Sequence, residues 1–312
     1  MAVQVEEGVD AGLVWHYGNP VAEARAMADG HGVAALGNRD IIEVSGPDRL
    51  DWLHNLTTQH LTSLRAGAAT SMLLLSPTVH IEHVLYAVDD GERLLGWTEP
   101  GRGADLVAFL DRMRFMLRVE VSLRKDLQLA WFGHQVAVGE GVVVRDSELG
   151  GSEVFLPAGT ALPEAGTPVG TWAFEAARIA AGVPRIFVDT DHKTIPNEIG
   201  LLGTHLDKGC YRGQETVARV HTLGRPPRRL VQLHLDGSLL ELPAPGAQLE
   251  LDGRAVGFVG SSARHHELGP VALGLVKRNV PVEATLLADG IPAAQEILVD
   301  PEVGLHVRPV LR

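Results

Sequence analysis

The single cysteine of this 312-residue chain lies in a short segment rich in glycine and charged side chains. The segment, residues 208–219, reads KGCYRGQETVAR, so Cys210 has Lys208 and Arg212 within two positions. A thiol reacts as its thiolate, and neighbouring cations stabilise that form. Two interpretations stay open: a reactive, functional thiol, or a small buried apolar side chain, the usual state of a free cysteine. The adjoining glycines and charges favour the first, because charges are costly to bury unpaired.

The same segment opens a stretch of positive charge. Residues 208–229 contain six cations against one acid, Glu215, a net charge of +5 in a chain of net charge −12. The cations are Lys208, Arg212, Arg219, Arg225, Arg228 and Arg229. Such a run is usually a solvated face, and it would also suit a ligand with several carboxylates. Direct nucleic-acid binding is not predicted, because the stretch lacks the interleaved aromatic residues that stack on bases.

Composition limits the remaining classes of function. One cysteine excludes an intrachain disulfide and a cysteine-only metal site, and it cannot hold an iron–sulfur cluster in the usual four-thiolate manner. Residues 1–14 contain three acids where a signal peptide would be basic and then apolar. No run approaches the ~18 apolar residues of a membrane span. We therefore predict a cytoplasmic protein that does not enter a membrane.

The histidines do not indicate a metal site. His80 and His83 lie three residues apart in a predicted strand, where such side chains point to opposite faces. His265 and His266 also point apart if the chain is extended there. Since no other ligand spacing is recognisable, no metal site is predicted.

Hydrophobic periodicity in the first third predicts an α+β unit. Strand and helix patterns alternate in the order β-α-β-β-β-α-β, which is typical of an elaborated ferredoxin-like unit. The turn 89–91, Asp-Asp-Gly, separates two of the strands as a hairpin. The expected strands are 40–45, 71–75, 81–88, 93–97 and 118–123, and the expected helices follow residues 48 and 105.

The rest of the chain predicts a second α+β region and a barrel. Short apolar runs at 129–132, 142–144 and 154–156 precede a helix at 169–181. Beyond the extended linker 225–228, six short strands at close spacing indicate a small antiparallel barrel. These strands are 230–235, 248–251, 255–259, 271–276, 284–287 and 296–299. We predict three parts, residues 1–125, 126–227 and 228–312.

The pattern KGCYxGQE at residues 208–215 resembles the signature of the YgfZ family of folate-binding proteins, relatives of the glycine-cleavage aminomethyltransferase, the T-protein. Similar family segments are IEVSGPD at 42–48, GVP at 182–184, IPNE at 195–198 and GFVGSS at 257–262. The resemblance implies ferredoxin-like α+β subdomains around a central folate site, with a C-terminal antiparallel β-barrel. It also implies a tetrahydrofolate-binding accessory protein that serves iron–sulfur cluster assembly or maintenance, including enzymes of tRNA modification.

The resemblance further implies the site residues. Glu198 matches a glutamate that binds the pterin ring, and a carboxylate can accept hydrogen bonds from the ring's 2-amino and N3–H groups. Without the resemblance, Glu198 would be interpreted as an exposed loop residue. The arginines would meet the glutamate tail of folate, and Cys210 would lie near the opening. The cofactor-binding residues expected are Glu198, Lys208, Arg212, Gln214, Glu215, Arg219 and Arg228.

One departure from the aminomethyltransferases concerns the catalytic acid. In an ungapped alignment His83 and Val84 occupy the places of their acidic pair, and Glu82 lies one position earlier. Loss of the carboxylate that would handle the proton at the folate amine disfavours aminomethyl transfer, and substitution by Glu82 stays open as an alternative. Three alternatives stay open: an accessory factor whose partners are iron–sulfur client or assembly proteins, a folate-dependent one-carbon transferase, and a folate sensor in which Cys210 is merely packed.

Overall fold

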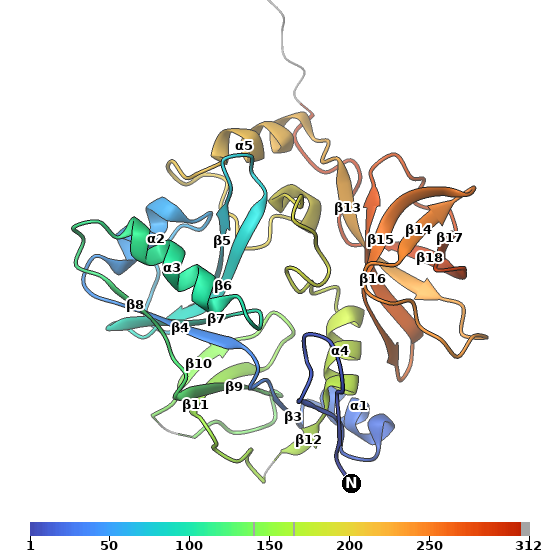
Figure 1. Cartoon of the computed structure of the whole chain (residues 1–312), viewed down its shortest axis with the longest axis horizontal. Helices are drawn as coiled ribbons and strands as arrows, with labels where there is room; N and C mark the ends of the chain where they lie inside the picture. The colour runs from blue at the N-terminus through green and yellow to red at the C-terminus, as the bar shows by residue number, and fades with distance from the viewer. Residues whose placement is uncertain (140, 165, 307–312) are drawn as a thin grey trace, which may run out of the picture. The chain divides into compact units, whose positions relative to one another are not determined.

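The computed structural model describes residues 1–139, 141–164 and 166–306. By compactness the chain divides into two units (Figure 1). The first comprises Met1–Leu74 and His83–Ala177, and the second comprises Leu75–Glu82 and Arg178–Arg312. The three predicted ranges, 1–125, 126–227 and 228–312, do not coincide with these units, and that division stays a prediction. The α+β class with a C-terminal antiparallel barrel is confirmed.

One sheet of the first unit has the predicted order of elements. Its strand order is β5-β6-β7-β4-β8, and α2 and α3 lie between strands of this region. The turn at Asp90 closes the β6–β7 hairpin, since its N–H donates to the carbonyl of Arg93 at 3.0 Å. The bounds are β4 Asp40–Ser45, α2 Arg49–Leu56, β5 Ala69–Leu75, β6 Ile81–Asp89, β7 Arg93–Thr98, α3 Gly103–Met113 and β8 Glu120–Leu123.

Helical spacing buries one face of each helix against this sheet. Trp52 and Leu53 of α2, and Leu106 and Leu110 of α3, join one apolar cluster with strand residues such as Leu85. Burying a side chain of this size contributes about 1.5–3 kcal/mol. The apolar periodicity seen in the sequence is therefore what fixes both helices on the sheet.

A second sheet of the first unit was only partly predicted. Its order is β10-β11-β9-β3-β12, with β3 and β12 parallel. The first 35 residues gave no predicted element, yet they form a hairpin, a helix and β3. The bounds are β1 Val3–Gln4, β2 Val14–His16, α1 Pro20–Ala28, β3 Gly32–Ala35, β9 Leu127–Phe132, β10 Val143–Asp146, β11 Ser152–Pro157, β12 Thr167–Val169 and α4 Thr171–Ala180.

The second unit carries a closed six-stranded barrel, preceded by a short 3₁₀ helix η1 and helix α5. The predicted strand at 296–299 is wrong in its start, because β18 begins at Ile291, directly after an Asp289-Gly290 turn. Both turn residues have positive φ, 53° and 82°, as in a tight hairpin turn. The bounds are η1 Pro196–Ile199, α5 Gln214–Leu223, β13 Arg228–Leu235, β14 Gln248–Leu251, β15 Arg254–His265, β16 Gly269–Lys277, β17 Leu286–Ala288 and β18 Ile291–Ile297.

Within the second unit, Asp189 joins the loop before η1 to the barrel. Its carboxylate is 0% exposed and pairs with the Arg178 guanidinium at 2.9 Å. It also accepts hydrogen bonds from the backbone N–H groups of Arg185 and Ser261, at 2.8 and 2.6 Å. Ser261 belongs to β15, so one buried carboxylate holds the loop against that strand. The sequence placed these residues in separate motifs and gave no sign of their contact.

No helix in the described part of the chain is both long and apolar enough to cross a bilayer.

Gly260 should tolerate no side chain. A Cβ there would lie 2.3 Å from Oδ1 and 2.6 Å from Cα of Asp189. We expect Gly260→Ala to lower the free energy of unfolding by about 1–3 kcal/mol, the usual cost of overpacking, in urea denaturation. Gly237→Ala is the matched control, because its nearest neighbour would be Pro270 at 3.6 Å. Equal stability of both variants would contradict the close packing of β15 on Asp189.

Candidate functional site

Glu198 lies in η1 and is 1% exposed. Pro196 begins this short helix, and the Glu198 side chain reaches back so that Oε2 accepts the N–H of Ile195 at 3.1 Å. This local hydrogen bond helps to explain how the charged side chain of Glu198 can be buried. The alternative interpretation of Glu198 as an exposed loop residue is therefore wrong.

Arg228, the first residue of β13, binds the same carboxylate through two nitrogens. Its Nε donates to Oε1 of Glu198 at 2.8 Å, and its Nη2 donates to Oε2 at 2.9 Å. Such a two-pronged pair fixes the plane of the carboxylate as well as its position. Glu198 thus accepts three hydrogen bonds and keeps capacity for about one more, on Oε1.

Asp191 binds the opposite edge of the Arg228 guanidinium, at 2.7 Å from Nη1 and 3.0 Å from Nη2. Although burial opposes its ionisation, hydrogen bonds from Arg228 and Thr194 hold the pKa of Asp191 well below its usual range. Burial likewise opposes the charge of Arg228, but its bonds to both carboxylates raise its pKa. We call Asp191, Glu198 and Arg228 the carboxylate clamp.

The clamp changes the role expected of Arg228. Sequence reasoning placed it among the cations that meet the carboxylate tail of folate. In the structure its guanidinium is already engaged by Asp191 and Glu198, so it positions Glu198. Sequence reasoning missed Asp191, since nothing in the local pattern pairs it with an arginine 37 positions away.

Asn197, next to Glu198, carries an unused acceptor. It is 4% exposed, its Nδ2 donates to the carbonyl of Val217 in α5 at 3.3 Å, and its buried Oδ1 has no hydrogen-bond partner among the described residues. Buried polar atoms are nearly always paired, so an unpaired carbonyl in this turn marks it as unusual. The sequence motif contained Asn197, but no role was predicted for it.

Cys210 is exposed and forms no disulfide. The interpretation of a packed, buried thiol is therefore wrong. The loop that presents it is closed by Gln214, whose Nε2 donates to the carbonyl of Lys208 at 3.0 Å. Gly213 then enters α5 with φ 84°, a conformation that L side chains rarely adopt. Glu215 is exposed in the first turn of α5, where the positive end of the helix dipole stabilises its negative charge.

Lys208 is buried beside Cys210. Its side chain leaves the residue 4% exposed, with Nζ 5.0 Å from the ring centroid of Tyr211. Burial lowers the pKa of the Lys208 ammonium to about 8 and raises the pKa of Tyr211 to about 12. Lys208 was predicted among the folate-binding residues, and in the structure its ammonium lies over an aromatic ring.

The remaining cations do not form one surface. Arg212 lies 3.7 Å from Glu82, which belongs to the same unit, and Arg219 and Arg225 are exposed. Arg229 is 0% exposed and donates to the carbonyl of Val280 and to Gln295, both at 3.0 Å. The basic stretch predicted from the sequence is thus divided between exposed arginines and buried cations.

His83, at the place of the missing acid, is a half-buried residue of the first unit. Its ring lies 5.7 Å from that of Phe109, and burial lowers its pKa. Its Nδ1 has no hydrogen-bond partner among the described residues. A neutral imidazole without a carboxylate partner is a poor substitute for an ionised acid. Within the described ranges, no cluster of three or more histidine, cysteine or acidic residues could hold a metal ion.

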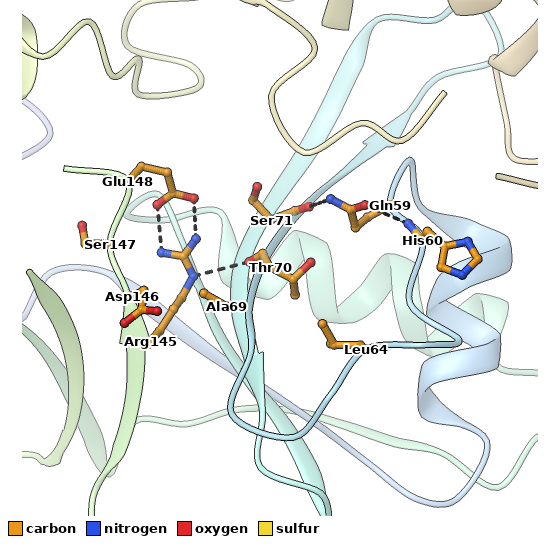
Figure 2. Close-up of a pocket in the computed structure, with 10 residues that line it drawn as sticks. All are labelled: Gln59, His60, Leu64, Ala69, Thr70, Ser71, Arg145, Asp146, Ser147 and Glu148. Atoms are coloured by element: carbon orange, nitrogen blue, oxygen red, sulfur yellow. Dashed lines mark hydrogen bonds and ion pairs between the residues drawn. The ribbon is translucent and has the colours of Figure 1, made fainter. Parts of the chain in front are cut away.

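The first unit also has an open polar pocket of about 420 Å³ (Figure 2). Arg145 on one wall is paired with Glu148 and with Glu153, at 2.8 Å from the latter, and is itself fully buried. The opposite wall carries Gln59 and Ser71, which are joined by a hydrogen bond. This pocket contains none of the predicted site residues, which all belong to the second unit.

The fold defined by these two units is that of an aminomethyltransferase. The chain superimposes on the crystal structure of the glycine cleavage system aminomethyltransferase T from Bartonella henselae with a TM-score of 0.78, over 97% of this chain and 95% of that chain, at 18% identity. The sequence is also similar to an Arabidopsis thaliana protein named "putative transferase, chloroplastic", with 26% identity over 86% of this chain and 70% of that protein. No protein-family model matches the sequence.

The buried ammonium of Lys208 predicts a pH dependence of stability. Its pKa falls from 10.5 in the unfolded chain to about 8 in the fold. Between these values the unfolded chain holds the proton that the folded chain has lost, so the free energy of unfolding gains a contribution that rises with pH. We expect Lys208→Met to remove this part of the rise in urea denaturation series. The exposed Lys193→Met is the control and should keep it; an unchanged rise in Lys208→Met would contradict the burial.

Proposed function

We propose that this chain binds a reduced folate, tetrahydrofolate or a derivative, and that Glu198 is the acceptor for the pterin ring. The observation that carries the proposal is the carboxylate clamp: a buried carboxylate, oriented by Arg228, with capacity left on Oε1. The ring's 2-amino group or N3–H can donate to that oxygen. The same turn holds a second unused acceptor, Oδ1 of Asn197. The aminomethyltransferase fold supports this assignment.

We infer that the bound folate serves an accessory role, similar to that of the YgfZ family, in the assembly or maintenance of iron–sulfur enzymes, including those that modify tRNA. The KGCYRGQE motif and the exposed Cys210 support this inference. Because one thiol cannot hold a cluster alone, any contact of Cys210 with a cluster would be shared with a partner protein. A cytoplasmic location stays a prediction.

One-carbon transfer is the second candidate, since the Arabidopsis relative is named a transferase. It requires a carboxylate at the folate amine. His83 has no carboxylate, and the carboxylate of Glu82 is paired with Arg212 at 3.7 Å, so neither position offers a free carboxylate. These positions favour the accessory role over catalysis.

Folate binding is tested by anaerobic calorimetric titration with tetrahydrofolate. We expect saturable binding by the parent chain and a loss of at least about tenfold in affinity for Glu198→Gln, because the amide replaces an acceptor oxygen with a donor. Glu267→Gln, a change at a side chain that is 77% exposed, should bind like the parent. Far-UV and near-UV spectra would establish that each variant is folded. No binding by the parent would refute the proposal.

The role of the thiol is tested by Cys210→Ser in cells that lack the native chain. We expect folate affinity within about twofold of the parent, because Cys210 is exposed and takes no part in the hydrogen bonds of the clamp, together with reduced activity of iron–sulfur enzymes. The purified parent should transfer no one-carbon unit from a loaded folate to an amine acceptor. Normal iron–sulfur enzyme activity in Cys210→Ser would remove the thiol from the mechanism, and measurable transfer would favour the second candidate.

A further inference from the structure

The end of α3 displays large apolar side chains to solvent. Residues 112–118 read RMRFMLR, and we call them the arginine–apolar turn. Phe115 and Met116 are each 89% exposed, and Met113 and Leu117 are each 44% exposed. Isolated exposed apolar residues are ordinary, but four within five positions form a contiguous patch of the kind that marks interaction sites.

Hydrogen bonds at the end of α3 define the turn that carries these side chains. Helix α3 ends at Met113, whose carbonyl accepts the indole N–H of Trp52 at 3.2 Å. The N–H of Leu117 donates to the carbonyl of Arg114 at 2.9 Å, closing a turn, and Phe115 within it has φ 51°. A bulky residue in that left-handed region is uncommon. The turn therefore projects Phe115 and Met116 outward instead of folding them onto the neighbouring core.

Arginines surround the apolar side chains. Arg114 pairs with Asp111 at 3.1 Å, and this is an exposed pair that a stronger partner can replace. Arg118 is held more firmly, since its Nε and Nη2 donate to Asp48 at 3.1 and 2.6 Å. Arg112 is exposed and makes no ion pair among the described residues. Every residue of the turn is thus arginine, methionine, phenylalanine or leucine. Aromatic residues, methionine and arginine are the types enriched at protein–protein interfaces, where lysine and acids are depleted.

We propose that the arginine–apolar turn docks into an apolar cleft of a partner protein whose rim carries carboxylates. Phe115 and Met116 would enter the cleft, and Arg112 and Arg114 would pair with its rim. A lipid surface fits less well, because the turn has only three cations and the chain carries a net charge of −12. This inference does not depend on folate binding.

The test places a photoreactive methionine analogue at position 116 of the full chain in living cells. Leu240, which is 91% exposed in the other unit, is the matched control position. We expect position 116 to cross-link to one protein, at a site flanked by aspartate or glutamate. That protein is then purified, and its affinity for the parent chain is compared with that for Met116→Ser, Arg112→Glu and Leu240→Ser.

Met116→Ser and Arg112→Glu should each weaken this purified binding by at least about tenfold, and added salt should weaken binding of the parent. Leu240→Ser should bind like the parent. All three changes are on exposed side chains, so the thermal midpoints should stay close to that of the parent. Three results would each overturn the proposal. These are cross-links to lipid, cross-linking at position 116 no greater than at position 240, and an affinity of the purified partner that neither Met116→Ser nor Arg112→Glu changes.

Discussion

The pairing of Arg228 with Glu198 is the interaction on which the candidate site depends. It joins the first residue of the barrel to a 3₁₀ turn 30 positions earlier, so the closed barrel fixes the orientation of a buried carboxylate. Burying charges costs several kcal/mol per ion unless geometry and hydrogen bonds compensate. Here Asp191, Thr194 and the Ile195 N–H supply that compensation. The result is an oriented acceptor that does not need to reorganise when a ligand donates to it.

The second unit combines this fixed acceptor with an exposed thiol. The carboxylate of Glu198 accepts three hydrogen bonds and has capacity for about one more. Cys210, in contrast, is exposed on a loop that is closed by Gln214 and contains the buried Lys208. Under the proposed function these two groups have different tasks: Glu198 would recognise the folate, and Cys210 would meet a partner protein. The arginine–apolar turn, proposed as a docking segment, would be a further point of contact with other proteins.

The fold was largely predictable because local patterns dictate it. The periodicity of apolar residues in 40–123, and the short apolar runs beyond residue 228, indicate which side chains face a core. The structure has the corresponding helices and strands. Helix α5 was not predicted, because its sequence was interpreted only as part of the positively charged stretch. Its start also depends on the positive φ of Gly213, which the sequence pattern does not indicate. The identity of Glu198 as a candidate came from resemblance, but its partners did not. Asp191 and Arg228 meet only through tertiary folding, which no local pattern encodes.

Binding of folate at Glu198 is tested most directly by a crystal structure of the chain with tetrahydrofolate bound under anaerobic conditions. We predict a pterin nitrogen within about 2.7–3.2 Å of Oε1 of Glu198, while Arg228 keeps its contacts with Glu198 and Asp191. Folate bound away from Glu198, or bound only after Arg228 has left the carboxylate, would contradict it.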